Sequence, residues 1–235
     1  AGTTVNDIAF QARSGSTNHL TVLGTGNIGI GTVSPDALLH LKSSVSNGVM
    51  LKLENNNDDQ FAPRLQFLKD VSADAEADGD HLGQIQFLGQ DSGDVITNYA
   101  SIMGIADDVT GGTEDGRLRF EVIKNADQDG SQMFLTATGL GIGTDSPTAL
   151  LTTYVADAAP ATSGSTAAGV GLRIAQDGGT NCLDIGHAGS YGWIQATRSA
   201  DLSVETDLSI NPNGGSVGIG TAIPSSFDSE ANNLV

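Results

Sequence analysis

Ile28-Gly29-Ile30-Gly31-Thr32-Val33-Ser34-Pro35 is the first of three versions of one pattern in this chain, which we call connectors 1, 2 and 3. Connector 2 is Leu140-Gly141-Ile142-Gly143-Thr144-Asp145-Ser146-Pro147, and connector 3 is Val217-Gly218-Ile219-Gly220-Thr221-Ala222-Ile223-Pro224. Alternate glycines remove the side chains from one face of an extended strand, and aliphatic side chains line the other face. Glycine also lets other backbones come very close. The pattern therefore predicts several copies of the chain meeting around an axis.

The spacing of the connectors is uneven. Their first glycines are residues 29, 141 and 218. A solenoid repeats at a short fixed period, which this chain does not do. The spacing predicts modules of different size, separated by one recurrent connector.

Composition and charge restrict the class of protein. Of 235 residues, 31 are glycine, 5% are aromatic and 38% are hydrophobic, which is lean for a chain that builds its own large core. Small modules often need oligomerisation to be stable. The net charge of −18 opposes binding to nucleic acid and to anionic membranes, and no apolar run is long enough to span a bilayer. Parallel copies would repel one another, so the acidity points to a saline environment in which salt screens the charge.

The single cysteine and the first residues allow two narrower expectations. Cys182 has no intramolecular partner for a disulfide and lies in an expected strand, so we expect a buried, inert thiol. The four histidines have no metal-ligand spacing. Residues 1–10 read as mid-protein sequence, so we expect a segment of a longer polypeptide.

Strict alternation of apolar and polar residues dominates the chain, and no segment has a sustained helical period. The alternation predicts β-strands of half-buried antiparallel sheets. The expected strands are residues 7–12, 20–23, 50–54, 64–68, 83–87, 99–103, 117–122, 133–137, 171–174, 182–185, 193–196, 202–204 and 208–210. Residues 36–41 follow a proline and are expected to form a short helical turn or a strand.

The connectors and strands together predict an all-β chain of successive modules. The expected organisation is the end of an upstream β module (1–26), a first neck (27–35), a larger β module (36–137), a second neck (138–147), a smaller β module (148–213), a third neck (214–224) and the start of a further module (225–235).

Several stretches resemble the tail-fibre proteins of tailed bacteriophages, notably those of marine and cyanobacterial hosts. The resemblance lies in residues 25–35 with Leu39-His40-Leu41, in 51–55, 82–87, 100–102 and 117–120, and in 208–221. It implies an elongated, parallel homotrimeric fibre of small β-sandwich or β-prism modules, joined by narrow, glycine-rich, intertwined necks. Similar connectors occur in bacterial surface and filament proteins.

In such a fibre the connectors would be thin necks of three chains. Ile30, Ile142 and Ile219 would pack near the axis, beside Ile28, Leu140 and Val217. Thr32, Thr144 and Thr221 would pair strands across chains. Pro35, Pro147 and Pro224 would end each neck, because proline cannot donate a hydrogen bond to a β-ladder. The expected neck residues are Ile28, Gly29, Ile30, Gly31, Thr32, Pro35, Leu140, Gly141, Ile142, Gly143, Thr144, Pro147, Val217, Gly218, Ile219, Gly220, Thr221 and Pro224.

Two further stretches are candidate binding sites. Asp74, Glu76, Asp78 and Asp80 alternate like the ligands of a calcium loop, but the position of the final glutamate ligand is Ile85. The sequence favours a solvated acidic hairpin tip, with Ca²⁺ binding as the alternative and no other cofactor expected. Tyr191 and Trp193 lie on one strand face, where they fill a small core or, alternatively, stack against a sugar.

No arrangement of residues predicts catalysis. The acidic residues are too evenly spread to single out a glycosidase pair, and the motifs of serine hydrolases, zinc proteases and phosphate loops are missing. We expect a non-enzymatic shaft segment of a virion tail fibre, outside the cell, that supports adhesion to the host surface. Its expected partners are further copies of itself, other virion tail proteins and a host glycan or protein receptor. The alternatives are a bacterial extracellular adhesin or filament subunit, and a polysaccharide-degrading tailspike.

Overall fold

A computed structural model describes residues 7–70, 75–124, 127–175, 180–210, 212, 213 and 217. These residues form fourteen strands and no helix, which confirms the all-β prediction for the part of the chain described. Accordingly, none of these residues belongs to a helix that could cross a membrane. The chain divides into two compact units, residues 1–66 and 67–235. The expected module boundaries stay a prediction, because membership of a sheet does not show what folds independently.

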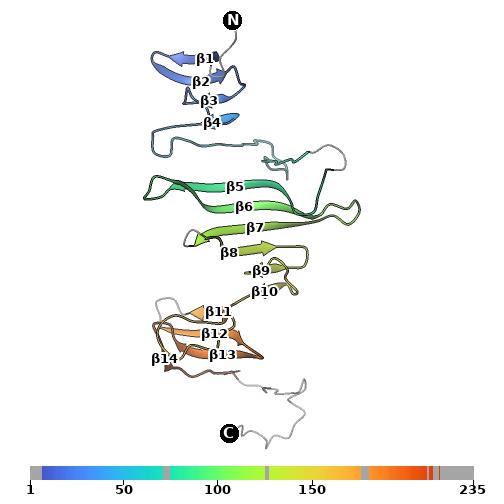
Figure 1. Ribbon diagram of the computed structural model, residues 1–235, viewed down its shortest axis with the longest axis vertical. Coiled ribbons are helices and arrows are strands. Elements are labelled where there is room, and N and C mark those ends of the chain that lie inside the picture. Colours follow the sequence, from blue (N-terminus) through green and yellow to red (C-terminus); the bar gives the residue numbers. More distant parts are fainter. Residues whose placement is uncertain are drawn as a thin grey trace, which may run out of the picture. The chain divides into compact units, whose positions relative to one another are not determined.

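The strands form three separate sheets, which we call sheets A, B and C (Figure 1). Sheet A has the order β1-β2-β3-β4, with β1 (Ile8–Ser14), β2 (Thr17–Leu23), β3 (Ile28–Ile30) and β4 (Leu39–Leu41). Residues 36–41, left open as helical turn or strand, thus contain a strand.

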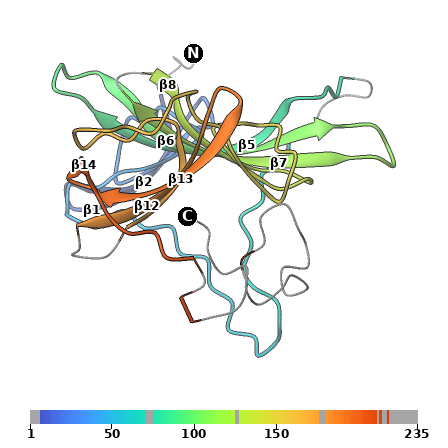
Figure 2. The ribbon, with the colours of Figure 1, turned by 90° about the horizontal axis from the view of Figure 1, so that it is seen from below.

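Sheet B has the order β10-β9-β8-β7-β6-β5. Its strands are β5 (Asp80–Gln90), β6 (Ile96–Asp108), β7 (Asp115–Lys124), β8 (Asp127–Leu135), β9 (Leu140–Ile142) and β10 (Leu151–Thr153). The long strands β5, β6 and β7 overlap in one curved band when viewed from below (Figure 2). Sheet C has the order β11-β12-β13-β14, with β11 (Val170–Ala175), β12 (Asn181–Ala188), β13 (Tyr191–Arg198) and β14 (Asp201–Glu205).

Each expected strand overlaps an observed one except at three places, and β10 was not expected. Residues 50–54, 64–68 and 208–210 alternate like strands, but they pair with no strand in the described chain. Elsewhere neighbouring strands are antiparallel, apart from the pairs β3–β4 and β9–β10, which are parallel. Alternation of apolar and polar residues indicates only a tendency to form a strand. A β-ladder also needs a neighbouring strand with which to pair.

Each sheet separates its side chains into an apolar face and a polar face, because cross-strand partners point to the same side. The apolar face of sheet A is Phe10, Ala12, Leu20, Val22, Ile28, Ile30, Leu39 and Leu41. That of sheet B is Ile85, Phe87, Ala100, Ile102, Leu118, Phe120, Val122, Met133, Leu135, Leu140, Ile142 and Leu151. That of sheet C is Leu172, Ile174, Leu183, Ile185, Ile194 and Ala196.

The single chain leaves the apolar faces open and buries residues of the polar faces. Phe10, Phe87 and Ile174 are 56%, 53% and 57% exposed. On the opposite faces Thr21, Ser101, Asp184 and Thr197 are 0%, 2%, 4% and 1% exposed. The apolar residues Leu23, Met103, Ile105 and Phe134 are buried on these opposite faces as well, at 6%, 4%, 3% and 5% exposed.

Candidate functional site: the connectors and the apolar faces

Connectors 1 and 2 have the same structure. In each, a three-residue strand (β3 or β9) runs antiparallel to the strand before it and parallel to the short strand after it. The parallel ladder of connector 1 is extended at both ends, where Ile28 N donates to Leu38 O at 2.8 Å and Lys42 N donates to Ile30 O at 2.9 Å. Leu140 N and Tyr154 N make the equivalent bonds to Leu150 O and Ile142 O, each at 2.9 Å. Parallel neighbours usually need a longer crossover than these loops provide.

The first glycine of each connector is covered by the loop that follows it. Gly29 and Gly141 are buried on the polar faces of sheets A and B. A Cβ atom on Gly29 would lie 2.6 Å from Thr32 O, and one on Gly141 would lie 2.2 Å from Thr144 O. The close approach expected from the glycines is therefore made within one chain, by its own backbone.

The second glycine of each connector has a backbone conformation that side chains rarely adopt. Gly31 has φ +76° and Gly143 has φ +75°, in the left-handed region. A Cβ atom on Gly31 would also lie 2.1 Å from Lys42 O. The two glycines of a connector are thus required for different steric reasons. The first allows a close approach of the backbone, and the second allows a sharp turn.

Threonine and proline stabilise the loop locally. Ser34 N donates to Thr32 Oγ1 at 3.2 Å, and Ser146 N donates to Thr144 Oγ1 at 3.2 Å. Each proline is buried, and a Cβ atom on Gly29 would lie 3.4 Å from Pro35 Cδ. Pairing of the threonines across chains stays a prediction.

The aliphatic residues of the connectors point away from these loops, onto the apolar faces. Ile28, Ile30 and Ile142 are 37%, 48% and 45% exposed, and Leu140 is half-buried. They continue the apolar faces of sheets A and B without a break. In connector 3, Val217 is 46% exposed. The other expected neck residues of connector 3, Gly218, Ile219, Gly220, Thr221 and Pro224, lie outside the described residues.

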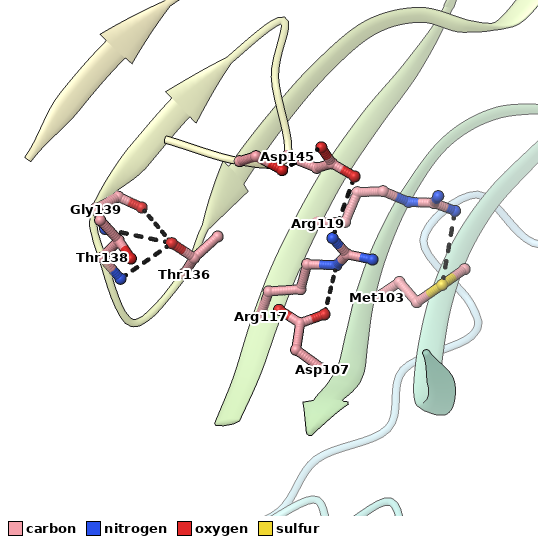
Figure 3. A network of polar contacts seen from close by, with 9 residues as sticks. Met103, Asp107, Arg117, Arg119, Thr136, Thr138, Gly139 and Asp145 are labelled. Atoms are coloured by element: carbon pink, nitrogen blue, oxygen red, sulfur yellow. Dashed lines mark hydrogen bonds and ion pairs between the residues drawn. The ribbon is translucent and has the colours of Figure 1, made fainter. Parts of the chain in front are cut away.

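Arg117 on the polar face of sheet B forms an ion pair with the loop of connector 2. Arg117 Nε lies 3.0 Å from Asp107 Oδ1, and Arg117 Nη1 lies 3.3 Å from Asp145 Oδ2 in the connector loop (Figure 3). The same guanidinium lies 5.8 Å from the centre of the Phe134 ring, a cation–π distance. The neighbouring Arg119 contacts Met103 Sδ at 3.6 Å, as Figure 3 also shows.

Sheet C holds another ion pair on its polar face, and in this pair the carboxylate is buried. Arg173 donates from Nε and Nη2 to the two carboxylate oxygens of Asp184, both at 2.7 Å. This hydrogen-bonded carboxylate raises the pKa of the Arg173 guanidinium above its ordinary value. Sequence reasoning missed these arginine–carboxylate pairs, although charged residues at alternate positions of expected strands carried the signal.

Asp78 and Asp80 of the candidate calcium loop have different partners. Asp78 Oδ1 accepts a hydrogen bond from Val109 N at 3.0 Å, while Asp80 Oδ1 lies 2.5 Å from Lys69 Nζ. This bond to Lys69, helped by one from Ala77 N, lowers the pKa of Asp80. Asp74 lies outside the described residues, and Glu76 is exposed. Among the residues described, no group of three or more potential ligands could hold a metal ion.

Tyr191 and Trp193 lie on the same face of β13 but in different surroundings. Tyr191 is 53% exposed, whereas the Trp193 ring packs over Gly186 of β12, where a Cβ atom would lie 2.3 Å from the ring. The indole Nε1 is buried and has no hydrogen-bond partner among the residues described. The indole therefore packs against its own sheet, and carbohydrate binding stays a prediction.

Comparison with known proteins gives no family assignment. No family model matches the chain, and no curated protein is similar to it at a significant level.

Proposed function

We propose that this chain is a shaft subunit of an extracellular fibre, assembled as a parallel homotrimer, and that the fibre is a virion tail fibre that supports host attachment. One observation carries the proposal. All three sheets expose an apolar face in the single chain and bury polar residues on the other face. A partner that covers all three exposed apolar faces best explains why the single chain leaves them open.

A symmetric partner meets this need economically. If three copies lie in parallel around one axis, each sheet meets its two symmetry mates at the same height, and their apolar faces enclose a common core. The polar faces, with Arg117, Arg119 and Arg173, then point outward. The exposed Ile30 and Ile142 continue the same core through the connectors.

Burial of the apolar faces supplies enough free energy for assembly. Each fully buried aliphatic or aromatic side chain contributes roughly 1.5–3 kcal/mol. Association costs an estimated 4–15 kcal/mol in lost translational and rotational freedom. A handful of buried side chains in each chain offsets this cost, and the three faces together provide more than a handful.

In this function the protein acts mechanically. A stiff shaft holds receptor-binding surfaces away from the particle, and several weak contacts add up through their high effective concentration. The partners would be two further copies, other tail proteins and a host glycan or protein receptor. The resemblance of the connectors to phage tail fibres supports the choice of three copies and of a virion.

Light scattering on a size-exclusion column in high salt tests the assembly. We expect a mass three times the 23.9 kDa of one chain, and elongated particles by negative-stain electron microscopy. A folded monomer would overturn the proposal. A particle of twice the chain mass would also overturn it, and would indicate two sheets packed face to face.

A further inference from the structure

Residues 49–66, which we call the arm, have the sequence pattern of two strands but form none in the described chain. Leu51, Leu53 and Leu65 are 63%, 47% and 59% exposed. They alternate with the polar residues Lys52, Glu54 and Arg64, which are also exposed. Such a pattern is stable in water only when the apolar side is covered.

Hydrogen bonds within the single chain fix the turn between the two halves of the arm. Asn57 N donates to Asn55 Oδ1 at 2.9 Å, and Phe61 N donates to Asp59 Oδ1 at 2.9 Å. Asn55 Nδ2 also donates across the turn to Phe61 O at 3.1 Å. The arm therefore has the turn of a hairpin, while the backbone groups on either side of the turn lack a ladder.

Sheet B offers the complementary feature, a long edge without a partner. Within the described residues, β5 pairs with β6 alone, so one side of β5 presents unpaired N–H and C=O groups. Natural proteins cover or interrupt an edge of this length. Both faces of the sheet extend to this edge, with Ile85 and Phe87 on the apolar side and Gln84 and Gln86 on the polar side.

Two contacts fix how the chain enters sheet B. A Cβ atom on Gly83 of β5 would lie 2.5 Å from Phe67 Cβ, so Phe67 covers the apolar face of sheet B at this position. Lys69 then pairs with Asp80, at the start of β5. Both contacts lie at the start of β5, and among the described residues no strand pairs with its outer edge.

We propose that the arm of one copy adds to the β5 edge of a neighbouring copy as an extension of its sheet B. Leu51, Leu53 and Leu65 would then extend the apolar face, and Lys52, Glu54 and Arg64 would extend the polar face. Main-chain hydrogen bonds supply the affinity of such strand addition, and the alternating side chains fix its register. The inference rests on the proposed homotrimer, because it needs parallel copies at the same height. It implies that neighbouring copies interlock.

Site-specific photo-crosslinking of the full chain tests the proposal. p-Benzoylphenylalanine replaces Leu53 in one variant and Leu65 in a second, in case the first fails to assemble. It replaces Val45 in the control, which is 72% exposed but precedes the arm. We expect the arm variants to give a band at twice the 23.9 kDa chain mass on a denaturing gel. Peptide mass spectrometry should place the crosslink within residues 80–90, and the Val45 variant should give no crosslink to that segment.

The mass of each sample before irradiation separates the two proposals. A trimer with crosslinks to β5 of another chain supports the arm exchange. A trimer whose arm crosslinks only within its own chain, or only to another segment, overturns the exchange and leaves the fibre intact. A monomer overturns both.

Discussion

At the scale of single residues, the two glycines of each connector are the most constrained positions. Gly29 and Gly141 must lack a side chain because their own loop covers them, and Gly31 and Gly143 must adopt a positive φ. The sequence pattern singled out these positions as residues of a neck between chains, which stays a prediction. It did not reveal that the approaching backbone belongs to the same chain.

The substitution Gly141→Ala should lower the free energy of unfolding by about 1–3 kcal/mol, within the range of severe single substitutions. The added methyl group would lie 2.2 Å from Thr144 O, so the loop must move. Gly111→Ala is the matched control, because no atom lies within 4 Å of its added methyl group. Urea unfolding followed by circular dichroism measures the free energy of unfolding of both variants. An equal effect of the two substitutions would contradict a covered glycine.

The ion pair of Asp80 with Lys69 makes a pH-dependent contribution to stability. The pKa of Asp80 is lowered in the folded chain, so its stabilisation is present above the ordinary carboxyl value of about 4 and is lost as the pH falls through the lowered pKa. Asp80→Asn should therefore destabilise the protein at pH 7 and have progressively less effect below about pH 4. Thermal unfolding of both proteins across this range measures the difference. A difference that grows on acidification would refute the assignment.

At the scale of elements, each sheet has one apolar and one polar face, and the exposed apolar faces favour association in water. In sheet B the apolar face extends across six strands, while the opposite face holds the arginine contacts of Figure 3. The arginines neutralise carboxylates that are partly removed from water, of which Glu121 is the least exposed. The charged groups of the polar face already have partners within the chain. The apolar face is therefore the surface that would associate with another copy.

A substitution that places a charge on the apolar face of sheet B tests whether another copy covers this face. Ile85 is 41% exposed in the single chain, so Ile85→Asp would be tolerated if the chain worked alone. In a trimer the new carboxylate would be buried without a partner, at a cost of several kcal/mol. We expect Ile85→Asp to abolish assembly in light scattering, and Val45→Asp, on an exposed loop, to leave the mass unchanged. Assembly of both variants would show that this face is not the interface.

At the scale of the whole molecule, the charge of −18 works against the association that the apolar faces favour. In a parallel assembly, equivalent carboxylates of the copies lie at the same height. Raising the salt from about 0.1 M to about 1 M shortens the screening length from roughly 10 Å to roughly 3 Å.

Assembly should therefore tighten as salt is raised. Sedimentation over a concentration series at both salt levels measures the dissociation constant, which we expect to fall in high salt. If ion pairs between copies held the assembly together, the dissociation constant would rise instead. Sodium chloride is the suitable salt, because sulfate would also strengthen apolar contacts by exclusion from the protein surface.

The sequence by itself determined which segments favour strands, which side chains share a face and where the chain turns sharply. These properties depend on neighbouring residues, through the two-residue period of a strand and the local sterics of glycine and proline. The alternation at residues 83–87 and 117–122 therefore predicted β5 and β7 correctly. The same local signal was equally strong at 50–54 and 64–68, where the described chain provides no partner strand.

Only the tertiary structure decided which strands pair, that β4 and β10 return parallel to β3 and β9, and that the loops of connectors 1 and 2 fold over Gly29 and Gly141. It also decided that Arg173 meets Asp184 and that Arg117 reaches Asp145 in the connector loop. These outcomes join residues that are distant in sequence, so no local period encodes them. They depend on which backbone groups find a partner and on which face is left uncovered.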